Sequence, residues 1–559
     1  MDPRPRTPTR TRAAVAAVAC AVVLTLVASA CGSSTKGTSA AASSPTSSIK
    51  PQNGGSLVVA ITGESGGWAP SDFFWSDGAN LVASSVMETL AMPGADSGAK
   101  PWLAKSWIAD AAFDRWLVKL QPNVKFQDGE PFDAAAVKLN LETAQKGIIT
   151  SQALGTMLKD VKVIDPLTVE VDLNQPWAAF PSSLLDSQAA YMAAPAMLKS
   201  PNHGADHPIG TGPFTFDHWT PNNDFRAVRN PNYWGGLDAN GNRRSGLPHL
   251  DSIDFRVITD NGTRRAALQT GDVNMILTTD PATANAMSAQ FDVIKDWSET
   301  PDFVALNTAP SVGGVANPFR DIHARLALAY ATDARAVAAQ VGKGVQVPTG
   351  PWSPDNPWGL PADQNGYPGY DLAKAKQEVA AYEQDTGAHS LDIKLSGVAD
   401  IDTQRIMQVL QAQWKLAGIN VAVDTSDSTS LIVKTATSNF EAVNLGNYGY
   451  PDPDFDYFYW SKENANGVGK ISANFEQYTT PAIQNDLLAG RRSGFVNVRR
   501  QAYHDLVKQL NAGVTNIWLY RIPYTMIAAK NVMGLDMART IPFGNTMPRA
   551  WLADLWIKR

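Results

Sequence analysis

Cysteine is nearly absent from this chain: two occur in 559 residues, and both lie within the first 31 positions. Cys20 lies inside an apolar N-terminal run and Cys31 follows that run, so the rest of the chain has neither a thiol nor a disulfide. This excludes a cysteine nucleophile, a thiol redox centre and a cysteine-ligated metal from the body of the protein.

Histidine is also scarce, with seven residues, and patterns that bind metals are missing. His203 and His207 have a spacing that could bind a metal on a helix, but Gly204 and the preceding Pro201-Asn202 disfavour a helix there. No paired carboxylates and no phosphate-binding glycine loop stand out. The sequence therefore predicts no metal, no cofactor and no catalytic residue.

Charge and hydrophobicity exclude two further classes of protein. The formal net charge is −6 and no run of basic residues occurs, which argues against a nucleic-acid partner. After residue 30 no stretch approaches the roughly 18 consecutive apolar residues of a membrane span. A hydrophobic content of 44% with 18% charged residues is typical of a globular body.

The N-terminus has the pattern of a secretory signal peptide, predicted over residues 1–30. Four arginines precede an apolar core at Ala13–Val27, and the small residues Ala28-Ser29-Ala30 stand directly before Cys31. This order is similar to a bacterial lipobox, in which Cys31 would be lipidated and hold the protein on the outer face of the cytoplasmic membrane; an uncleaved membrane anchor is the alternative. Residues 31–50, rich in Ser, Thr, Ala and Gly, are predicted to be a flexible tether.

One pattern favours an enzyme. Gly63-Glu64-Ser65-Gly66-Gly67 fits G-x-S-x-G and follows a predicted strand at Ser56–Thr62, as a hydrolase nucleophile does. A nucleophile elbow must lead into a helix, and Trp68-Ala69-Pro70 does not begin one. A flexible glycine-rich turn is the simpler interpretation, and a secreted serine hydrolase using Ser65 is the remote alternative.

The stretch that organises the chain is His207–Gly236, HPIGTGPFTFDHWTPNNDFRAVRNPNYWGG. Its first part cannot be helical, because proline lacks an N–H and two glycines permit close backbone approach. Two short strands follow around the turn at Thr220–Asn223, and an aromatic pair, Tyr233-Trp234, precedes the final glycines. The pattern predicts a rigid corner followed by a hairpin.

This sequence motif resembles that of the extracytoplasmic solute-binding proteins of ABC importers, in the peptide- and nickel-binding branch called family 5. The same order of motifs continues with KPWLAKSW at residues 100–107, VKFQDGEPFDAAAV at 124–137 and LPHLDSIDFRVITD at 247–260. The resemblance implies an α/β, two-lobed fold of the periplasmic-binding-protein type (class II, cluster C). An extra subdomain in lobe one and two hinge crossings are part of that fold.

The resemblance also implies domain boundaries. Lobe one is expected at residues 51–300, with its subdomain at about 83–206, and lobe two at 301–532. Residues 533–559 are expected to return to lobe one, since Lys530–Gly534 resembles the second crossing. Local patterns agree with α/β units: Ile406, Leu410 and Trp414 form one buried stripe on a predicted helix, 401–417.

Three further elements are predicted in lobe one. A helix is expected around Leu81–Leu90 and a short strand at Val124–Phe126. Asp133 is the predicted N-cap of the helix that follows this strand.

Two aromatic, loop-rich stretches are candidates for the ligand site. They fall after predicted strands, where loops of α/β proteins meet the crevice between lobes. The predicted ligand-binding residues are Trp68, Phe73, Phe74, Trp75, Asn447, Tyr448, Tyr450, Asp452 and Asp454.

One position departs from the family pattern. Peptide-binding members place an Asp four residues before the proline of the second stretch, where it pairs with the ligand's amino group. Counting back from Pro453 gives Gly449. The charge-assisted hydrogen bond to an amino terminus is therefore missing at that position, unless Asp452 or Asp454 supplies it.

The expected function follows from the resemblance. The chain would be a monomeric receptor that captures a small solute, a peptide by family default, between its lobes and delivers it to a membrane permease driven by ATPases. A saccharide or metal chelate is the alternative ligand, and a sensor or chaperone without transport is the alternative role.

Overall fold

The computed structural model describes residues 50–559 apart from 74, 94–97, 149, 185–187, 298–300, 447–451, 536–540, 543–547 and 550. The chain divides into two compact units, Met1–Lys50 and Pro51–Arg559, and the second unit is described below. The predicted signal peptide, tether and lipidated Cys31 lie outside the described residues. Within the described part, no helix is both long enough and apolar enough to span a bilayer.

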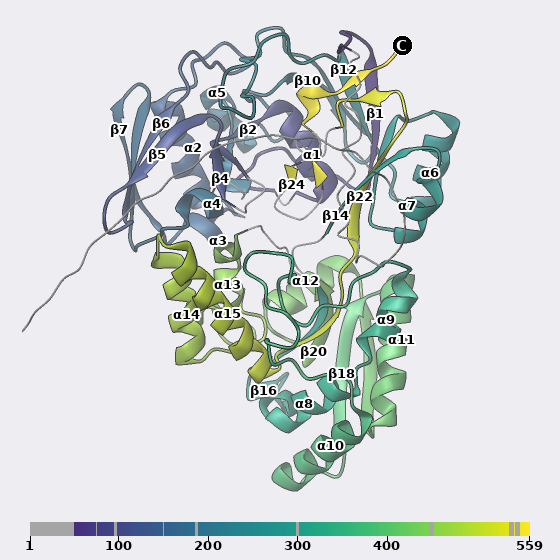
Figure 1. Ribbon diagram of the computed structural model, residues 1–559. Helices are drawn as coiled ribbons and strands as arrows, with labels where there is room; N and C mark the ends of the chain where they lie inside the picture. The colour runs from purple at the N-terminus through teal and green to yellow at the C-terminus, as the bar shows by residue number, and fades with distance from the viewer. Residues whose placement is uncertain are drawn as a thin grey trace, which may run out of the picture. The chain divides into compact units, whose positions relative to one another are not determined.

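Lobe one is built around a seven-stranded sheet (Figure 1). Its central strand β1, Ser56–Ile61, pairs in parallel with β12 and β13, and the remaining pairs are antiparallel. In spatial order the strands are β10 (Phe214–Thr220), β11 (Asp224–Arg229), β12 (Ser252–Val257), β1, β13 (Met275–Thr278), β22 (Pro523–Ala528) and β14 (Asp292–Trp297).

Both faces of this sheet are buried, which explains why β1 reads as a continuous apolar run. Leu57, Val59 and Ile61 contribute to a core that also contains α1, Asp77–Val86. Ala60, on the opposite face, packs in a second cluster with α6 (Asn261–Thr270) and α7 (Pro281–Met287). Helix α1 begins a full turn before the segment near Leu81 at which the sequence suggested a helix, because the Ser76 hydroxyl caps it.

A four-stranded antiparallel sheet forms the extra subdomain that the resemblance implied. Its strands are β5 (Ala104–Ala109), β6 (Arg115–Leu120), β8 (Thr168–Leu173) and β7 (Leu158–Asp165). Helix α2, Ala134–Lys146, begins at the predicted cap Asp133, whose carboxylate accepts from the Ala136 N–H. The strand expected at Val124–Phe126 is absent from the structure, which has only a single bridge from Lys125 to Pro131 there.

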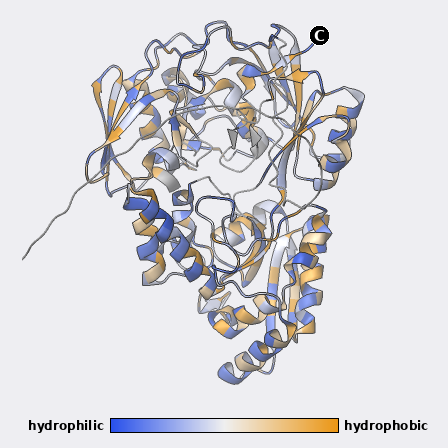
Figure 2. Cartoon of the chain, viewed as in Figure 1, coloured by the Kyte–Doolittle hydropathy of each residue, from blue (hydrophilic) through white to orange (hydrophobic). Residues whose placement is uncertain are grey.

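Lobe two is built around a five-stranded sheet with the order β19, β18, β20, β15, β21. These strands are Ile419–Ser426, Leu391–Val398, Ala442–Gly446, Asp302–Leu306 and Asn516–Tyr520. Val304 and Leu306 face a core with α8 (Ile322–Ala331) and α11 (Ile401–Leu416). The predicted stripe of α11 is confirmed, since Ile406, Leu410 and Trp414 are all buried. In Figure 2, α11 alternates hydrophobic and hydrophilic colours, as a helix with one buried face must.

The chain passes between the two sheets twice, as the resemblance implied. The first crossing joins β14, ending at Trp297, to β15, starting at Asp302; the second joins β21, ending at Tyr520, to β22, starting at Pro523. The second crossing corrects the expected boundary of lobe two at residue 532. Residues 523–528 already pair with β13 and β14 in lobe one, because their side chains complete the core of that sheet.

The organising stretch His207–Gly236 surrounds one buried carboxylate, that of Glu88 in β2, Glu88–Thr89. Its Oε1 accepts from Trp102 Nε1 at 2.9 Å and from the Tyr233 hydroxyl at 2.8 Å. Its Oε2 accepts from the Thr211 hydroxyl at 2.8 Å and from Trp234 Nε1 at 2.6 Å. Burial raises the pKa of Glu88 to about 7, since these hydrogen bonds only partly offset the loss of water.

The glycines of the same stretch allow backbones to touch. A side-chain carbon at Gly210 would lie 2.4 Å from the Val86 carbonyl oxygen, and one at Gly212 would lie 2.6 Å from the same group. One at Gly236 would lie 2.6 Å from the Trp102 ring. The motif therefore holds α1 and the subdomain to the main sheet, and its conspicuous residues serve the scaffold.

We predict that Glu88→Gln lowers the free energy of unfolding by roughly 2–4 kcal/mol at neutral pH, because the amide nitrogen would face groups that donate. Urea denaturation measures the change. The control Glu142→Gln, on an exposed pair with Lys138, should change stability by less than about 0.5 kcal/mol.

The pH dependence of Glu88 has a defined sign. Its folded pKa of about 7 lies above the ordinary value of 4.5, so the folded protein holds a proton that the unfolded chain has lost. Raising the pH from about 4.5 to above 7 therefore lowers the free energy of unfolding of the wild type but not that of Glu88→Gln. The difference in free energy of unfolding between the two proteins becomes smaller. A difference in free energy of unfolding that increases from pH 5 to pH 8 would contradict the raised pKa of Glu88.

Candidate ligand-binding cleft

The carboxyl ends of parallel strands β18 and β20 lie at the end of the lobe-two sheet from which both crossings leave. Asp302, the first residue of β15, pairs with Gly446, the last of β20, and with Tyr520, the last of β21. In α/β proteins, ligands bind at this end of the sheet. Of the two stretches selected from the sequence, the second follows β20 at this end of the sheet, and the first follows β1 in lobe one.

In the loop after β1, most of the predicted aromatics belong to the core. Trp68 is fully buried, with its ring edge-on to Phe225 and Trp219, and Trp75 is buried against Tyr191. Phe73 is half-buried and covers Gly67. Phe74 lies outside the described residues. A ligand-binding role for Trp68 and Trp75 stays a prediction, and their burial assigns them first to packing.

Ser65 has the surroundings of a turn residue. Its hydroxyl donates to the Gly67 carbonyl at 2.5 Å and accepts from the Gly67 N–H at 3.1 Å. The side chain is 5% exposed. No helix follows, since α1 begins at Asp77, so the geometry of a nucleophile elbow is not formed.

Asp452 caps the start of a short 3₁₀ helix, η4, Pro453–Asp456, and Asp454 lies within it. Both residues are buried. Asp454 Oδ1 lies 2.9 Å from Arg491 Nε, and Asp452 Oδ1 lies 2.5 Å from an Arg499 guanidinium nitrogen. Burial would raise the pKa of Asp454, but Arg491 outweighs burial and lowers it. These two carboxylates are therefore occupied by the protein's own arginines.

The same carboxylates accept hydrogen bonds from lobe one. Asp454 Oδ2 accepts from Trp177 Nε1 at 2.6 Å and from the Ser183 hydroxyl at 2.8 Å. Asp452 Oδ2 accepts from the Ser182 hydroxyl at 2.5 Å. The Ala178 N–H also donates to the Arg491 carbonyl at 2.8 Å. We call this set of contacts the interlobe network, and it joins α4 (Phe180–Leu184) to α14 (Pro481–Arg492).

The arginines of this network are enclosed by aromatic rings. Arg491 lies 3.6 Å from the ring centre of Tyr457, and Arg499 lies 4.8 Å from that of Trp358. Sequence reasoning missed both arginines. They follow the aspartates by dozens of residues on α14 and α15 (Val496–Gly513), and no local spacing links them.

The aromatic residues after η4 pack inside lobe two. Tyr457, Tyr459 and Trp460 form a core cluster with Trp352 and Leu487. A small apolar cavity adjoins this cluster, lined by Pro301, Phe303, Pro351, Asp456, Tyr459, Trp460, Asn516 and Trp518. The predicted residues Asn447, Tyr448 and Tyr450 lie outside the described residues.

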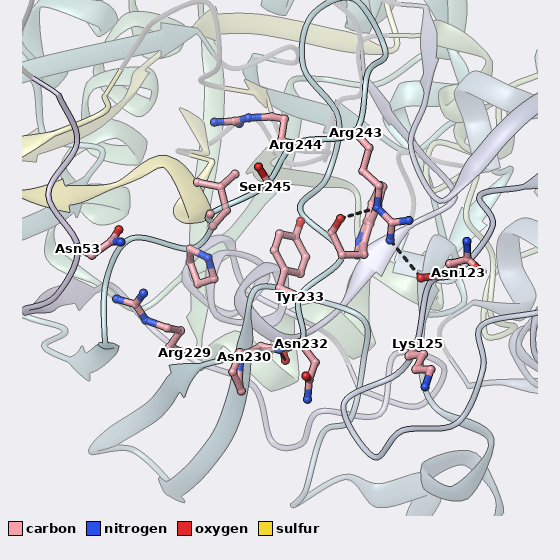
Figure 3. A pocket seen from close by; sticks show the side chains of 15 residues that line it. Asn53, Asn123, Lys125, Arg229, Asn230, Asn232, Tyr233, Arg243, Arg244 and Ser245 are labelled. Atoms are coloured by element: carbon pink, nitrogen blue, oxygen red, sulfur yellow. Dashed lines mark hydrogen bonds between the residues drawn. The ribbon is translucent and has the colours of Figure 1, made fainter.

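A second hollow, of about 630 Å³, lies on lobe one around Tyr233 (Figure 3). Its arginines are used by the protein: Arg244 pairs with Asp554, and Arg243 donates to the carbonyls of Trp234 and Asn123. The hollow is lined by lobe-one residues alone, and its polar groups fasten neighbouring loops. The end of the lobe-two sheet, where both crossings leave, is therefore the candidate site.

The motifs, the two sheets and the two crossings define a two-lobed binding protein. The chain belongs to the bacterial extracellular solute-binding proteins, family 5, whose middle-region model matches residues 98–468.

Three similar proteins illustrate the family. The glutathione-binding protein GsiB of Salmonella paratyphi A is 28% identical over 352 residues, which cover 62% of this chain and 65% of that protein. The chain thus spans slightly less than two thirds of this relative. The nickel-binding periplasmic protein of Escherichia coli is 25% identical over 506 residues, 84% of this chain and 90% of that protein. The structure of DppA from Helicobacter pylori, in complex with the peptide STSA, has a TM-score of 0.73 at 19% identity and covers 91% of this chain and 99% of that one.

We predict that Asp454→Asn lowers the free energy of unfolding by roughly 3–5 kcal/mol, because it leaves Arg491 buried without a counter-charge. Because the folded pKa of Asp454 is depressed, its contribution is present at neutral pH and is lost as the pH falls below its ordinary value of 3.8. Denaturation at pH 7 tests the magnitude. Asp505→Asn, which removes an exposed pair with Lys508, is the control and should cost less than about 1 kcal/mol. Equal losses in the two variants would show that the buried pair adds nothing beyond a surface pair.

Proposed function

We propose that this protein is an extracytoplasmic receptor that encloses a small solute between its two lobes and delivers it to an ABC importer. The observation that carries the proposal is the pair of crossings, which lets two separately packed sheets hinge about one end of lobe two. Ligand contacts made with both lobes would then stabilise the closed state. Membership in the solute-binding family supports the same role.

Relatives suggest a range of solutes. The similar proteins are named for glutathione and nickel, and the similar structure holds a tetrapeptide. A peptide or peptide-like solute is our proposed ligand class. Within the described residues no group of three His, Cys, Asp or Glu side chains could hold a metal ion, so direct metal capture is disfavoured and a chelate is the alternative.

The remaining parts of the proposal come from the sequence. Cys31 would carry lipid and residues 31–50 would tether the body to the outer face of the cytoplasmic membrane. Permease subunits with their ATPases would be the protein partners of a monomeric receptor. A binding role, and not an enzymatic one, suits the buried turn at Ser65.

We expect the full chain to carry a solute after purification. Native mass spectrometry of the protein, followed by denaturation, should show a mass that is bound in the first spectrum and released in the second. Reloading the emptied protein with the released compound should raise its melting temperature, because a ligand that binds the folded state stabilises it. A protein that purifies empty and gains no stability from peptides, glutathione or chelates would oppose the proposal.

The predicted loop after β20 supplies a second test. We expect the double substitution of Tyr448 and Tyr450 by Ala to weaken solute binding about tenfold or more without lowering the melting temperature of the empty protein. Calorimetry with the released compound measures the affinity. Tyr370→Ala, at a position that is 51% exposed, is the matched control. Unchanged affinity in the double variant would move the site away from this loop.

A further inference from the structure

Among the described residues, no side chain pairs with the carboxylate of Asp302. Asp302 begins β15, at the end of the five-stranded sheet from which both crossings leave. Its strand neighbours there are Gly446 and Tyr520, the last residues of β20 and β21. Asp302 is half-buried at this end of the sheet.

The carboxylate of Asp302 lies close to Gly446. A side-chain carbon at Gly446 would lie 3.2 Å from Asp302 Oδ1. A larger residue at that position would therefore crowd the carboxylate, whereas glycine keeps the space beside it open. This arrangement differs from that of Asp452 and Asp454, which are covered by arginines of their own lobe.

Within the described part of the chain, the side chain of Asp302 has no hydrogen bond and no ion pair. Burial alone raises its pKa to about 7. The neighbouring hydroxyl of Tyr520 also has no hydrogen-bond partner there, and burial followed by the charge of Asp302 raises its pKa. The charge of Arg405 lowers the pKa of Tyr520, but Arg405 is exposed and pairs with Asp402 at 2.7 Å.

An enclosed carboxylate without a partner costs free energy, and native proteins keep few such groups. A ligand that brings a positive charge and N–H donors would satisfy both Asp302 and the Tyr520 hydroxyl. A metal ion fits poorly, because no three ligating side chains come together among the described residues. The missing group is thus an organic cation.

We infer that Asp302 determines solute specificity by binding an ammonium group of the solute, with the Tyr520 hydroxyl beside it. This deepens the proposed solute-binding function and rests on it. Peptide-binding members of the family have an Asp at the position of Gly449, in the loop after β20. Asp302, at the end of the first crossing, would provide the negative charge that this chain lacks at that position. The solutes taken up would then carry a free amine, as unblocked peptides, amino acids and polyamines do.

The test uses the full chain and three pairs of probes, each in a form with free amines and a form with every amine acetylated: a pool of tri- to pentapeptides, a pool of amino acids, and spermidine. We expect the free form of at least one probe to bind and its acetylated form to bind at least tenfold more weakly. Asp302→Asn should weaken the free form at least tenfold and leave the acetylated form unchanged. Asp402→Asn, on the adjacent helix end and 81% exposed, is the control for a general charge effect and should leave both unchanged.

A second readout does not depend on the probe. Removing an unpaired, enclosed charge should leave the melting temperature of the empty Asp302→Asn protein equal to or above that of the wild type, so weaker binding would not reflect unfolding. Equal binding of free and acetylated probes, or of wild type and Asp302→Asn, would overturn the inference while the receptor function stands. If no free amine binds the wild type, the inference is also overturned, and the co-purified solute alone then decides the receptor function.

Discussion

Two short crossings constrain everything else in this molecule. The chain leaves lobe one after Trp297, re-enters it at Pro523, and does so from one end of the lobe-two sheet. Covalent connection is therefore confined to one region, and the lobes meet elsewhere through non-covalent contacts. The interlobe network at Asp452 and Asp454 is such a meeting, and its hydrogen bonds, unlike the two crossings, can break and re-form.

Three carboxylates show how differently one chemical group is used. Glu88 is held by four neutral donors and joins the scaffold of lobe one. Asp454 is neutralised by a buried arginine and accepts donors from the opposite lobe. Among the described residues Asp302 has neither a donor nor a counter-charge on its side chain, and it lies where a solute is expected. Since burial acts on all three, the partners decide which carboxylate is structural and which is available.

Much of the fold could be predicted from sequence because its signals are local. The cap at Asp133, the stripe on α11 and the hairpin after residue 213 each depend on neighbours within a few positions. The return to lobe one could not be located, because Pro523–Ala528 is as apolar as a lobe-two strand and only its pairing partners assign it. The start of helix α1 was predicted several residues too far along the chain, because the first turn of the helix is polar and does not show the apolar pattern.

The candidate site was harder to predict for a related reason. Aromatic and acidic residues near two strand ends predicted two ligand-binding loops, but the same pattern occurs in buried packing. Trp68 and Asp454 were selected by type, and the structure encloses them with Phe225 and Arg491, which are distant in sequence. Asp302 was overlooked because a single Asp before an apolar strand has no distinguishing neighbours.

The order of strands in lobe one has a consequence for how the protein is made. Strand β22, Pro523–Ala528, lies between β13 and β14 and pairs with both, so the sheet has a gap until nearly the whole chain has been synthesised. The five strands of lobe two, by contrast, all lie within residues 302–520, an uninterrupted insertion. The inserted lobe can therefore fold first during synthesis, whereas the sheet of lobe one is complete only after residue 528 has been made. A truncation near the C-terminus would damage the first-made half of the protein more than the second.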